Sequence, residues 1–203
     1  EGLHKKIKHA FQKAYVTNEG LLMNDYQGVY VLALAFELLN EEQVKSSVKR
    51  LVELIEQNGN RLDTGFLSVP YIMDVLCRYG YEDTAFALLF QTQCPSWLYE
   101  VNNGATTIWE SWDSIKPDGK VGSFSFNHYA FGCVGDWLAR YIGGISPIAP
   151  GYRTFRVSPH FPDQLDFVQT TFESINGHIH VEWKINADEE VLLSVTVPPN
   201  TEA

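Results

Sequence analysis

Several features that would place a protein in a common class are missing from this sequence of 203 residues. It has no run of roughly 18 or more apolar residues, so no segment is long enough to cross a membrane as a helix. Its formal net charge is −10, and no basic patch is available to neutralise phosphates. We therefore expect neither a membrane nor a nucleic acid as a partner.

Cysteine is scarce as well, with three residues far apart in apolar surroundings: Cys77, Cys94 and Cys133. The odd count and the lack of CxxC spacing argue against a disulfide framework and against a zinc site. We interpret all three as reduced thiols that fill the core. His178 and His180 share one face of a predicted strand, but no third ligand accompanies them, so we expect no metal and no cofactor.

Apolar residues make up 45% of the sequence, and their spacing predicts helices in its first part. Residues 28–39 are apolar nearly all round, which is typical of a helix buried on most sides. The next segment keeps apolar residues at helical spacing and fills the opposite face with lysine and glutamate, which predicts an amphipathic helix. Asn40 is its expected N-cap with Gln43 behind it, and Asn58-Gly59 is its expected end.

The alternation continues in three further predicted helices, over residues 65–80, 81–91 and 127–144. Successive inner and outer helices are what a barrel of helical hairpins requires, because its inner helices contact neighbours on every side. A helical bundle gives a similar pattern, so the periodicity alone leaves both architectures open.

The pattern changes at residues 145–153, which contain two prolines and a glycine and are predicted to form a linker or boundary. Beyond them, apolar and polar residues alternate over 179–185 and over 191–197, which predicts strands. Asn176-Gly177 lies between two strand-like runs and predicts a type I′ hairpin turn. We therefore expect a small antiparallel β-domain at the end of the chain.

Residues 96–131 concentrate the residue types that bind sugars. The C–H faces of sugars stack on aromatic rings, and sugar hydroxyls need carboxylate, amide and histidine partners. The segment contains Trp97, Tyr99, Glu100, Asn102, Asn103, Trp109, Glu110, Trp112, Asp113, Asn127, His128 and Tyr129. This content indicates a carbohydrate-related function.

Glu110 is the sharpest single candidate, because it lies between Trp109 and Trp112. A carboxylate between two tryptophans is partly desolvated and suited to proton transfer. Locally, Glu110 also fits a residue that caps or pairs at a helix terminus. His128 fits either a sugar ligand or a satisfied core histidine, and the residues alone leave these alternatives open.

Four stretches resemble, in order, the C-terminal part of bacterial α-L-rhamnosidases of glycoside hydrolase family 78. They are "TGFLSVPYIMDVLCRYGYEDTAFALLFQTQCPSWLYEVNNGATTIWESWDSIKPDG", "SFNHYAFGCVGDWLARYIGGI", "GYRTFRVSPHF" and "VTVPPNT". The resemblance covers most of the chain, and the blocks "GATTIWESWDS" and "FNHYAFG" are its specific motifs.

The resemblance implies a multi-domain fold of helices and strands. Residues 1–146 are expected to form a partial six-hairpin α/α barrel, about half of the complete one. Residues 147–203 are expected to form a small, incomplete antiparallel β-sandwich. Both expectations agree with the helical and strand patterns above.

The resemblance also implies hydrolysis of terminal α-L-rhamnosyl groups with inversion, by a general acid and a general base. The glutamate of the family's TTxWExW motif is its proposed base and corresponds to Glu110. The histidine of its FNHYA motif lines the rhamnose pocket and corresponds to His128. Trp109 and Trp112 are then expected to wall the sugar site. The expected partner is a rhamnose-containing oligosaccharide or glycoside.

The family's general acid belongs to the N-terminal half of the barrel, and no such motif occurs in this sequence. Because the chain also begins at Glu1 without methionine, we expect a fragment with little or no activity by itself. A half-barrel exposes an apolar edge, so we also expect self-association. Two alternatives stay open: another α/α-barrel carbohydrate-active enzyme, and a non-catalytic carbohydrate-binding module.

Overall fold

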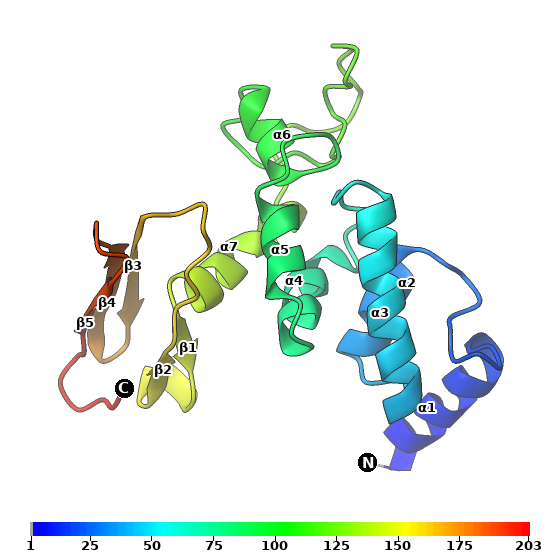
Figure 1. The fold of residues 1–203 in the computed structure, drawn as a ribbon, viewed down its shortest axis with the longest axis horizontal. Coiled ribbons are helices and arrows are strands. Elements are labelled where there is room, and N and C mark those ends of the chain that lie inside the picture. The colour runs from blue at the N-terminus through cyan, green and yellow to red at the C-terminus, as the bar shows by residue number, and fades with distance from the viewer. Residues whose placement is uncertain (1) are drawn as a thin grey trace. The chain divides into compact units, whose positions relative to one another are not determined.

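The computed structural model describes residues 2–203 of the chain. The chain divides into two compact units, Glu1–Cys133 and Val134–Ala203. The first unit is helical, and the second consists largely of antiparallel strands (Figure 1). No helix in the described part of the chain is long and apolar enough to cross a membrane.

Helices follow one another through the first unit. They are α1 (Gly2–Tyr15), α2 (Gln27–Ala35), α3 (Glu41–Gln57), α4 (Val69–Arg78), α5 (Glu82–Leu89), α6 (Trp97–Asn102) and the short 3-10 helix η1 (Ala130–Cys133). Helix α2 packs against α3, beside which it runs in Figure 1, and against α4. Helix α4 also packs against α5 and η1. Helices α2 and α4 thus have several neighbours, as predicted inner helices require.

Helices α2 and α3 differ in burial because their apolar patterns differ. Helix α2 is apolar after its first residue, Gln27, and Tyr30, Val31 and Leu34 are completely buried. Helix α3 keeps a charged face and buries one stripe, which consists of Ser47, Val48, Leu51, Val52 and Ile55. The predicted sequence of a buried helix and an amphipathic helix is therefore confirmed.

Helix α3 begins and ends where the sequence predicts. The Asn40 side chain accepts a hydrogen bond from the Gln43 amide, and the Gln43 side chain accepts one from the Asn40 amide, both at 2.9 Å. This capping box satisfies two backbone donors that the start of a helix would leave unpaired. Asn58 is the C-cap, and Gly59 follows with a φ of 68°, which glycine adopts without a steric penalty.

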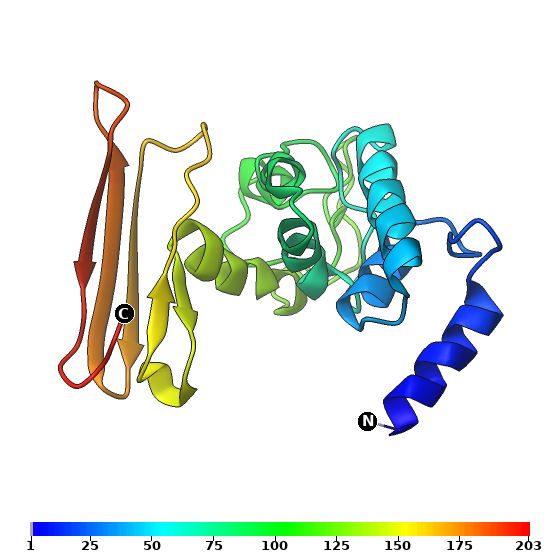
Figure 2. The same cartoon turned by 60° about the horizontal axis from the view of Figure 1, so that its bottom comes forward.

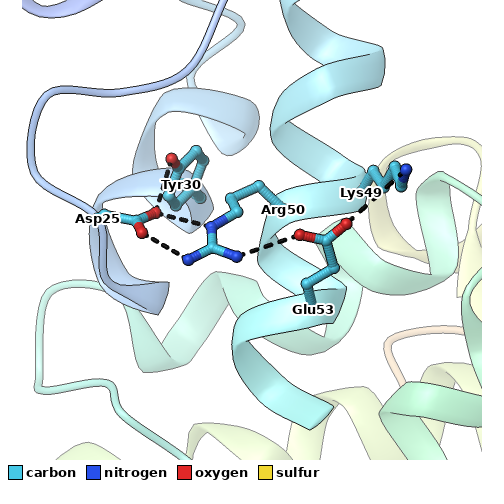
Figure 3. A network of polar contacts seen from close by, with 5 residues as sticks. All are labelled: Asp25, Tyr30, Lys49, Arg50 and Glu53. Atoms are coloured by element: carbon cyan, nitrogen blue, oxygen red, sulfur yellow. Dashed lines mark hydrogen bonds and ion pairs between the residues drawn. The ribbon is translucent and has the colours of Figure 1, made fainter. Parts of the chain in front are cut away.

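A polar network fixes the loop before α2 to helix α3 (Figure 3). Arg50 binds both carboxylate oxygens of Asp25, at 2.6 and 3.0 Å, and its Nη1 lies 3.1 Å from Oε2 of Glu53. The hydroxyl of the buried Tyr30 donates to Asp25 at 3.0 Å. The Arg50 hydrogen bonds lower the pKa of Asp25, and burial together with Asp25 raises the pKa of Tyr30 to about 12. The network holds the start of α2 against α3.

The second unit contains short helices and two antiparallel sheets. Its elements are α7 (Val134–Trp137), the π-helix η2 (Leu138–Ile142), β1 (Ile145–Pro147), η3 (Pro150–Tyr152), β2 (Phe155–Val157), β3 (Phe167–Ser174), β4 (Gly177–Ile185) and β5 (Val191–Thr196). Strands β1 and β2 form one sheet, and β3, β4 and β5 form the other in that order. Figure 2 shows these three strands side by side.

Strand β4 carries the core of this unit. Its inward side chains Ile179, Val181 and Trp183 are completely buried, as the alternation predicts. The Trp183 indole donates to the Ile142 carbonyl at 2.9 Å, so the buried ring keeps its hydrogen bond. Strand β5 pairs with β4, yet every one of its side chains is exposed.

The segment predicted as a linker or boundary contains strand β1, so the expectation of a linker is wrong, while that of a boundary stays a prediction. Ile145 pairs with Val157, and Pro147 pairs with Phe155. Ile145 and Phe155 are 2% and 1% exposed, so burial of apolar side chains stabilises the strand. Pro147 is tolerated because it is the last residue of β1.

The predicted hairpin between β3 and β4 forms, but its turn is not of type I′. Ser174 pairs with Gly177, so Ile175 and Asn176 are the central residues, and neither takes a positive φ. A type I′ turn needs a positive φ at both central positions. Gly177 has a φ of 124° instead, after the turn rather than within it.

The helix predicted over residues 127–144 begins later and is irregular. The His128 amide donates to the Ile108 carbonyl at 2.8 Å. This pairing lies in non-helical backbone, and the first helical residue is Ala130. The helical path then runs through η1, α7 and η2 in turn.

Candidate active site

Glu110 and His128 lie on two irregular segments, outside the helices and strands, that run in opposite directions beside each other. The Glu110 amide donates to the Ser125 carbonyl at 2.9 Å, and the His128 amide donates to the Ile108 carbonyl at 2.8 Å. Backbone pairing, rather than a shared helix, therefore brings the two predicted site residues onto neighbouring segments.

The Glu110 side chain is half-buried and held by one backbone donor. The Ser125 amide donates to Oε2 of Glu110 at 2.8 Å. The Ser125 hydroxyl in turn accepts from the Asn127 amide at 3.1 Å, which fixes the segment that supplies this donor. Within residues 2–203, Oε1 of Glu110 has no hydrogen-bond partner. One carboxylate oxygen is thus oriented while the other can accept a proton.

Trp109 and Trp112 are packed into the first unit, with 2% and 8% of their surfaces exposed. The Trp109 ring meets Phe126 edge-on at 5.1 Å, and the Trp112 ring stacks on Phe131 at 3.7 Å. The Trp112 indole N–H donates to the Thr64 carbonyl at 3.0 Å. These contacts cover most of both rings, so little of either ring is left for a sugar to contact. Their role as walls of a sugar site stays a prediction.

The loop that receives the Trp112 hydrogen bond is held by helix α2. Gln27, the first residue of α2, is 1% exposed. Its Nε2 donates to the Arg61 carbonyl at 2.9 Å, and its Oε1 accepts from the Asp63 amide at 2.8 Å. Both halves of the amide are therefore satisfied, and the position of Thr64 is fixed from the start of α2.

The His128 ring is half-buried between two aromatic rings. It stacks on Phe66 at 4.8 Å and on Tyr129 at 5.1 Å, with interplanar angles of 11° and 13°. The Ala130 amide donates to Nδ1 at 3.3 Å, so the neutral ring carries its proton on Nε2. Phe66 and Tyr129 are 43% and 88% exposed. Phe66 was not identified from the sequence, because its segment reads only as part of an apolar helix.

Glu100 in helix α6 is a buried carboxyl next to this site, and the sequence gives it no special role. It is 2% exposed, and its Oε2 accepts a hydrogen bond from the Trp109 amide at 3.2 Å. Its Oε1 has no hydrogen-bond partner among the described residues. Burial raises the pKa of Glu100 to about 7, although the Trp109 hydrogen bond acts against this rise.

A hollow of about 190 Å³ elsewhere in the first unit does not coincide with these residues. It is lined by Phe11, Tyr15, Leu22, Met23, Asn24 and Val29. Such an apolar lining offers few partners for sugar hydroxyls. Within residues 2–203, no group of three or more His, Cys, Asp or Glu side chains could hold a metal ion.

Two family models match the chain. The bacterial alpha-L-rhamnosidase 6 hairpin glycosidase domain matches residues 1–142, and the bacterial alpha-L-rhamnosidase C-terminal domain matches residues 144–203. The chain belongs to the bacterial α-L-rhamnosidase family. The family predicted from the sequence motifs is therefore confirmed.

Curated α-L-rhamnosidases match over the whole chain. One from Streptomyces avermitilis is 41% identical over 204 residues, which cover 99% of this chain and 20% of that protein. One from Formosa agariphila is 39% identical over 207 residues, which cover 100% of this chain and 22% of that protein. The chain thus spans about a fifth of the length of these relatives.

Solved α-L-rhamnosidase structures share the fold. The Streptomyces avermitilis α-L-rhamnosidase, solved in complex with L-rhamnose, has a TM-score of 0.94 at 40% identity and covers 98% of this chain and 20% of its own. The native enzyme from Aspergillus terreus has a TM-score of 0.94 at 39% identity and covers 98% and 24%.

These α-L-rhamnosidase matches confirm the predicted fold class. The chain is part of a six-hairpin glycosidase domain followed by a small antiparallel β-domain. The family models divide it between residues 142 and 144, while Val134–Ile142 belongs to the second compact unit. The boundary expected after residue 146 stays a prediction.

Proposed function

We propose that this chain contributes the general base to an enzyme that hydrolyses terminal α-L-rhamnosyl groups with inversion. Membership of the α-L-rhamnosidase family supports the reaction class. The complex of the Streptomyces avermitilis relative with L-rhamnose supports the sugar. The substrate is then a rhamnose-containing oligosaccharide or glycoside.

Glu110 is the proposed base. Its carboxylate takes a proton from a water molecule whose oxygen forms a bond to the anomeric carbon, on the face opposite the leaving group. The bond from that carbon to the glycosidic oxygen breaks, and a general acid supplies the proton for this oxygen. The observation that carries the proposal is the Glu110 carboxylate, oriented by the Ser125 amide and carried on a segment paired with that of His128.

His128 is the proposed rhamnose ligand. With Nδ1 occupied by the Ala130 amide, Nε2–H is left to donate to a sugar hydroxyl. The flanking rings of Phe66 and Tyr129 fix the orientation of the imidazole plane. Trp109 and Trp112, which are 2% and 8% exposed, then line the sugar site with little accessible surface.

The general acid is proposed to lie in the rest of the barrel, so the chain by itself should hydrolyse little or no substrate. An inverting glycosidase needs two carboxyl groups about 6.5–9.5 Å apart. The two domains of the proposed fragment are residues 1–146 and 147–203. The exposed apolar strand β5 supports the further expectation that the isolated chain self-associates, which sedimentation measurements would check.

Replacement of Glu110 by glutamine in the full-length protein tests the base. We expect kcat on an aryl α-L-rhamnoside to fall about 10²–10⁴-fold, the usual contribution of general base catalysis. Glu19→Gln, which changes an exposed loop glutamate, is the matched control and should leave kcat unchanged. Unchanged rhamnoside hydrolysis by the Glu110→Gln variant would exclude Glu110 as the base.

The same assay separates the alternatives. A panel of aryl glycosides identifies the sugar, and NMR of the first product identifies the anomer released. Release of another sugar would point to a different α/α-barrel enzyme. Sugar binding by a full-length protein that hydrolyses no glycoside would point to a non-catalytic module.

A further inference from the structure

Glu100 is a buried acidic group that has no role in the proposed hydrolysis as described so far. Helix α6 carries it on the inner side, where only 2% of the residue is exposed. Placing a carboxyl group there is costly, because it loses its water and gains few partners. Glutamine or an apolar residue would fill the same space at a lower cost.

Helix α6 is a firm support for this carboxyl group. Its N-cap Ser96 is completely buried and accepts from the Tyr99 amide at 3.1 Å. The Trp97 indole donates to the Phe131 carbonyl at 2.9 Å, and the Tyr99 hydroxyl donates to the Ile115 carbonyl at 2.8 Å. The helix is therefore tied at several points to the segments around it.

The partner of Glu100 is the backbone next to the proposed base. Its Oε2 accepts from the Trp109 amide at 3.2 Å, and the following amide, that of Glu110, donates to the Ser125 carbonyl at 2.9 Å. Two successive peptides that flank Trp109 are thus held: the N–H of Trp109 by a side chain of α6, and the N–H of Glu110 by a neighbouring backbone segment.

We propose that Glu100 is a positioning residue for the base: its carboxyl group holds the Trp109 amide, and so keeps the Glu110 carboxylate in one orientation. This inference rests on the proposed function of Glu110. A displacement of a catalytic group by about 1 Å can cost roughly 10²-fold in rate, so loss of this hydrogen bond should act on turnover.

The charge state of Glu100 is consistent with this role. Burial raises its pKa to about 7, and a neutral carboxyl group accepts the Trp109 amide through its carbonyl oxygen. Because of this raised pKa, the uncharged form of Glu100 predominates below neutral pH, and a glutamine side chain imitates it closely. The thiol of Cys94 is a second titratable group nearby, and its pKa is raised by its own burial, by Asp113 and by Glu100.

Two variants of the full-length protein test the proposal with an aryl α-L-rhamnoside. Glu100→Leu removes the acceptor, and we expect kcat to fall at least about 10-fold while KM changes less than about 3-fold. Glu100→Gln keeps an oxygen for the Trp109 amide and should stay within about 3-fold of wild-type kcat. Glu100→Asp, which withdraws the carboxyl group from the amide, should fall between them and serves if the leucine variant does not fold.

A matched control separates an effect on the orientation of Glu110 from a general loss of protein stability. Leu51 in helix α3 is completely buried and is not one of the site residues. Leu51→Ala therefore leaves a cavity beside α3. It should lower the unfolding temperature while leaving kcat unchanged below that temperature. Hydrogen exchange of the peptide over residues 105–112 gives a second measurement. It should become faster in Glu100→Leu and stay unchanged in Leu51→Ala.

The outcomes distinguish this inference from the proposed function. If Glu110→Gln abolishes hydrolysis but Glu100→Leu retains wild-type kcat and hydrogen exchange, the positioning role is wrong and the base assignment stands. A kcat of Glu100→Gln as low as that of Glu100→Leu also overturns it, since an acceptor oxygen would then not be sufficient. If the wild-type protein hydrolyses no rhamnoside, the proposed function itself fails.

Discussion

Glu100 and Glu110 are two glutamates of one short stretch, and each accepts a hydrogen bond from a backbone amide. Glu100 lies in helix α6 with 2% of its surface exposed, and it binds the Trp109 amide. Glu110 lies in a bend outside the helices and strands, is half-buried, and binds the Ser125 amide. The same type of side chain therefore serves as a buried hydrogen-bond acceptor at Glu100 and as a partly exposed carboxylate at Glu110.

Trp109 contacts the surroundings of both glutamates. Its amide is the partner of Glu100, and its ring packs edge-on against Phe126 in the segment that faces Glu110. One residue thus contacts both regions through different groups. The surroundings decide the role of each carboxyl group, as in glycosidases where neighbouring carboxyl groups have different tasks.

Trp109→Ala should have the largest effect on stability, because Trp109 contacts the surroundings of both glutamates. Removal of a ring that is 2% exposed should lower the free energy of unfolding by about 3–5 kcal/mol, because it leaves a large cavity. Urea unfolding of the full-length protein measures this. Tyr129→Ala, at a site 88% exposed, is the control and should change it by no more than about 0.5 kcal/mol. Equal effects of the two would show that the Trp109 packing is wrong.

Glu100→Gln should change how the stability of the protein depends on pH. The pKa of Glu100 rises from 4.5 to about 7 on folding, so below pH 4.5 the group is protonated in both states. As pH rises toward 7, the unfolded chain ionises while the folded chain does not, and the wild-type protein loses stability. The variant should therefore gain up to about 3 kcal/mol over wild type by pH 8.

Unfolding curves of both proteins at pH 4 and pH 8 check this prediction. A difference that is the same at both values would mean that Glu100 ionises in the folded state as readily as in the unfolded chain. Activity is not needed for this measurement, so it stands apart from the proposed reaction.

Glu110→Gln should have the smallest effect on stability. The glutamine oxygen still accepts from the Ser125 amide, and only the charge assistance of that bond is lost, which is worth about 1 kcal/mol or less. Thermal unfolding of the variant should therefore nearly match wild type while activity is lost. A large destabilisation would mean that Glu110 is chiefly structural.

Local interactions explain what the sequence predicted correctly. The capping box of Asn40 and Gln43 depends on residues three apart in the chain, and it forms as expected. The alternation of Ile179, Val181 and Trp183 likewise needs only the period of a strand, and all three are buried. The motif around Glu110 predicted the family because its residues are contiguous.

Contacts between distant segments explain what the sequence did not predict. The pairing of His128 with Ile108 delays the last helix, and no local signal announces it. Burial of Ile145 against its partner strand forms β1 despite the neighbouring prolines. Glu100 carries no motif of its own, since its role depends on the Trp109 amide coming back onto α6. The spacing of Trp109 and Trp112 likewise did not reveal that both rings are mostly covered.

The amide of Gln27 has a consequence for the chemical ageing of the protein. Deamidation would turn its Nε2 into an oxygen, so the Arg61 carbonyl would lose its donor and a negative charge would enter the interior. Burial to 1% exposure shields this amide from the water that the reaction needs. We expect mass spectrometry of stored protein to find deamidation first at the exposed Asn103, which precedes Gly104, while Gln27 remains intact.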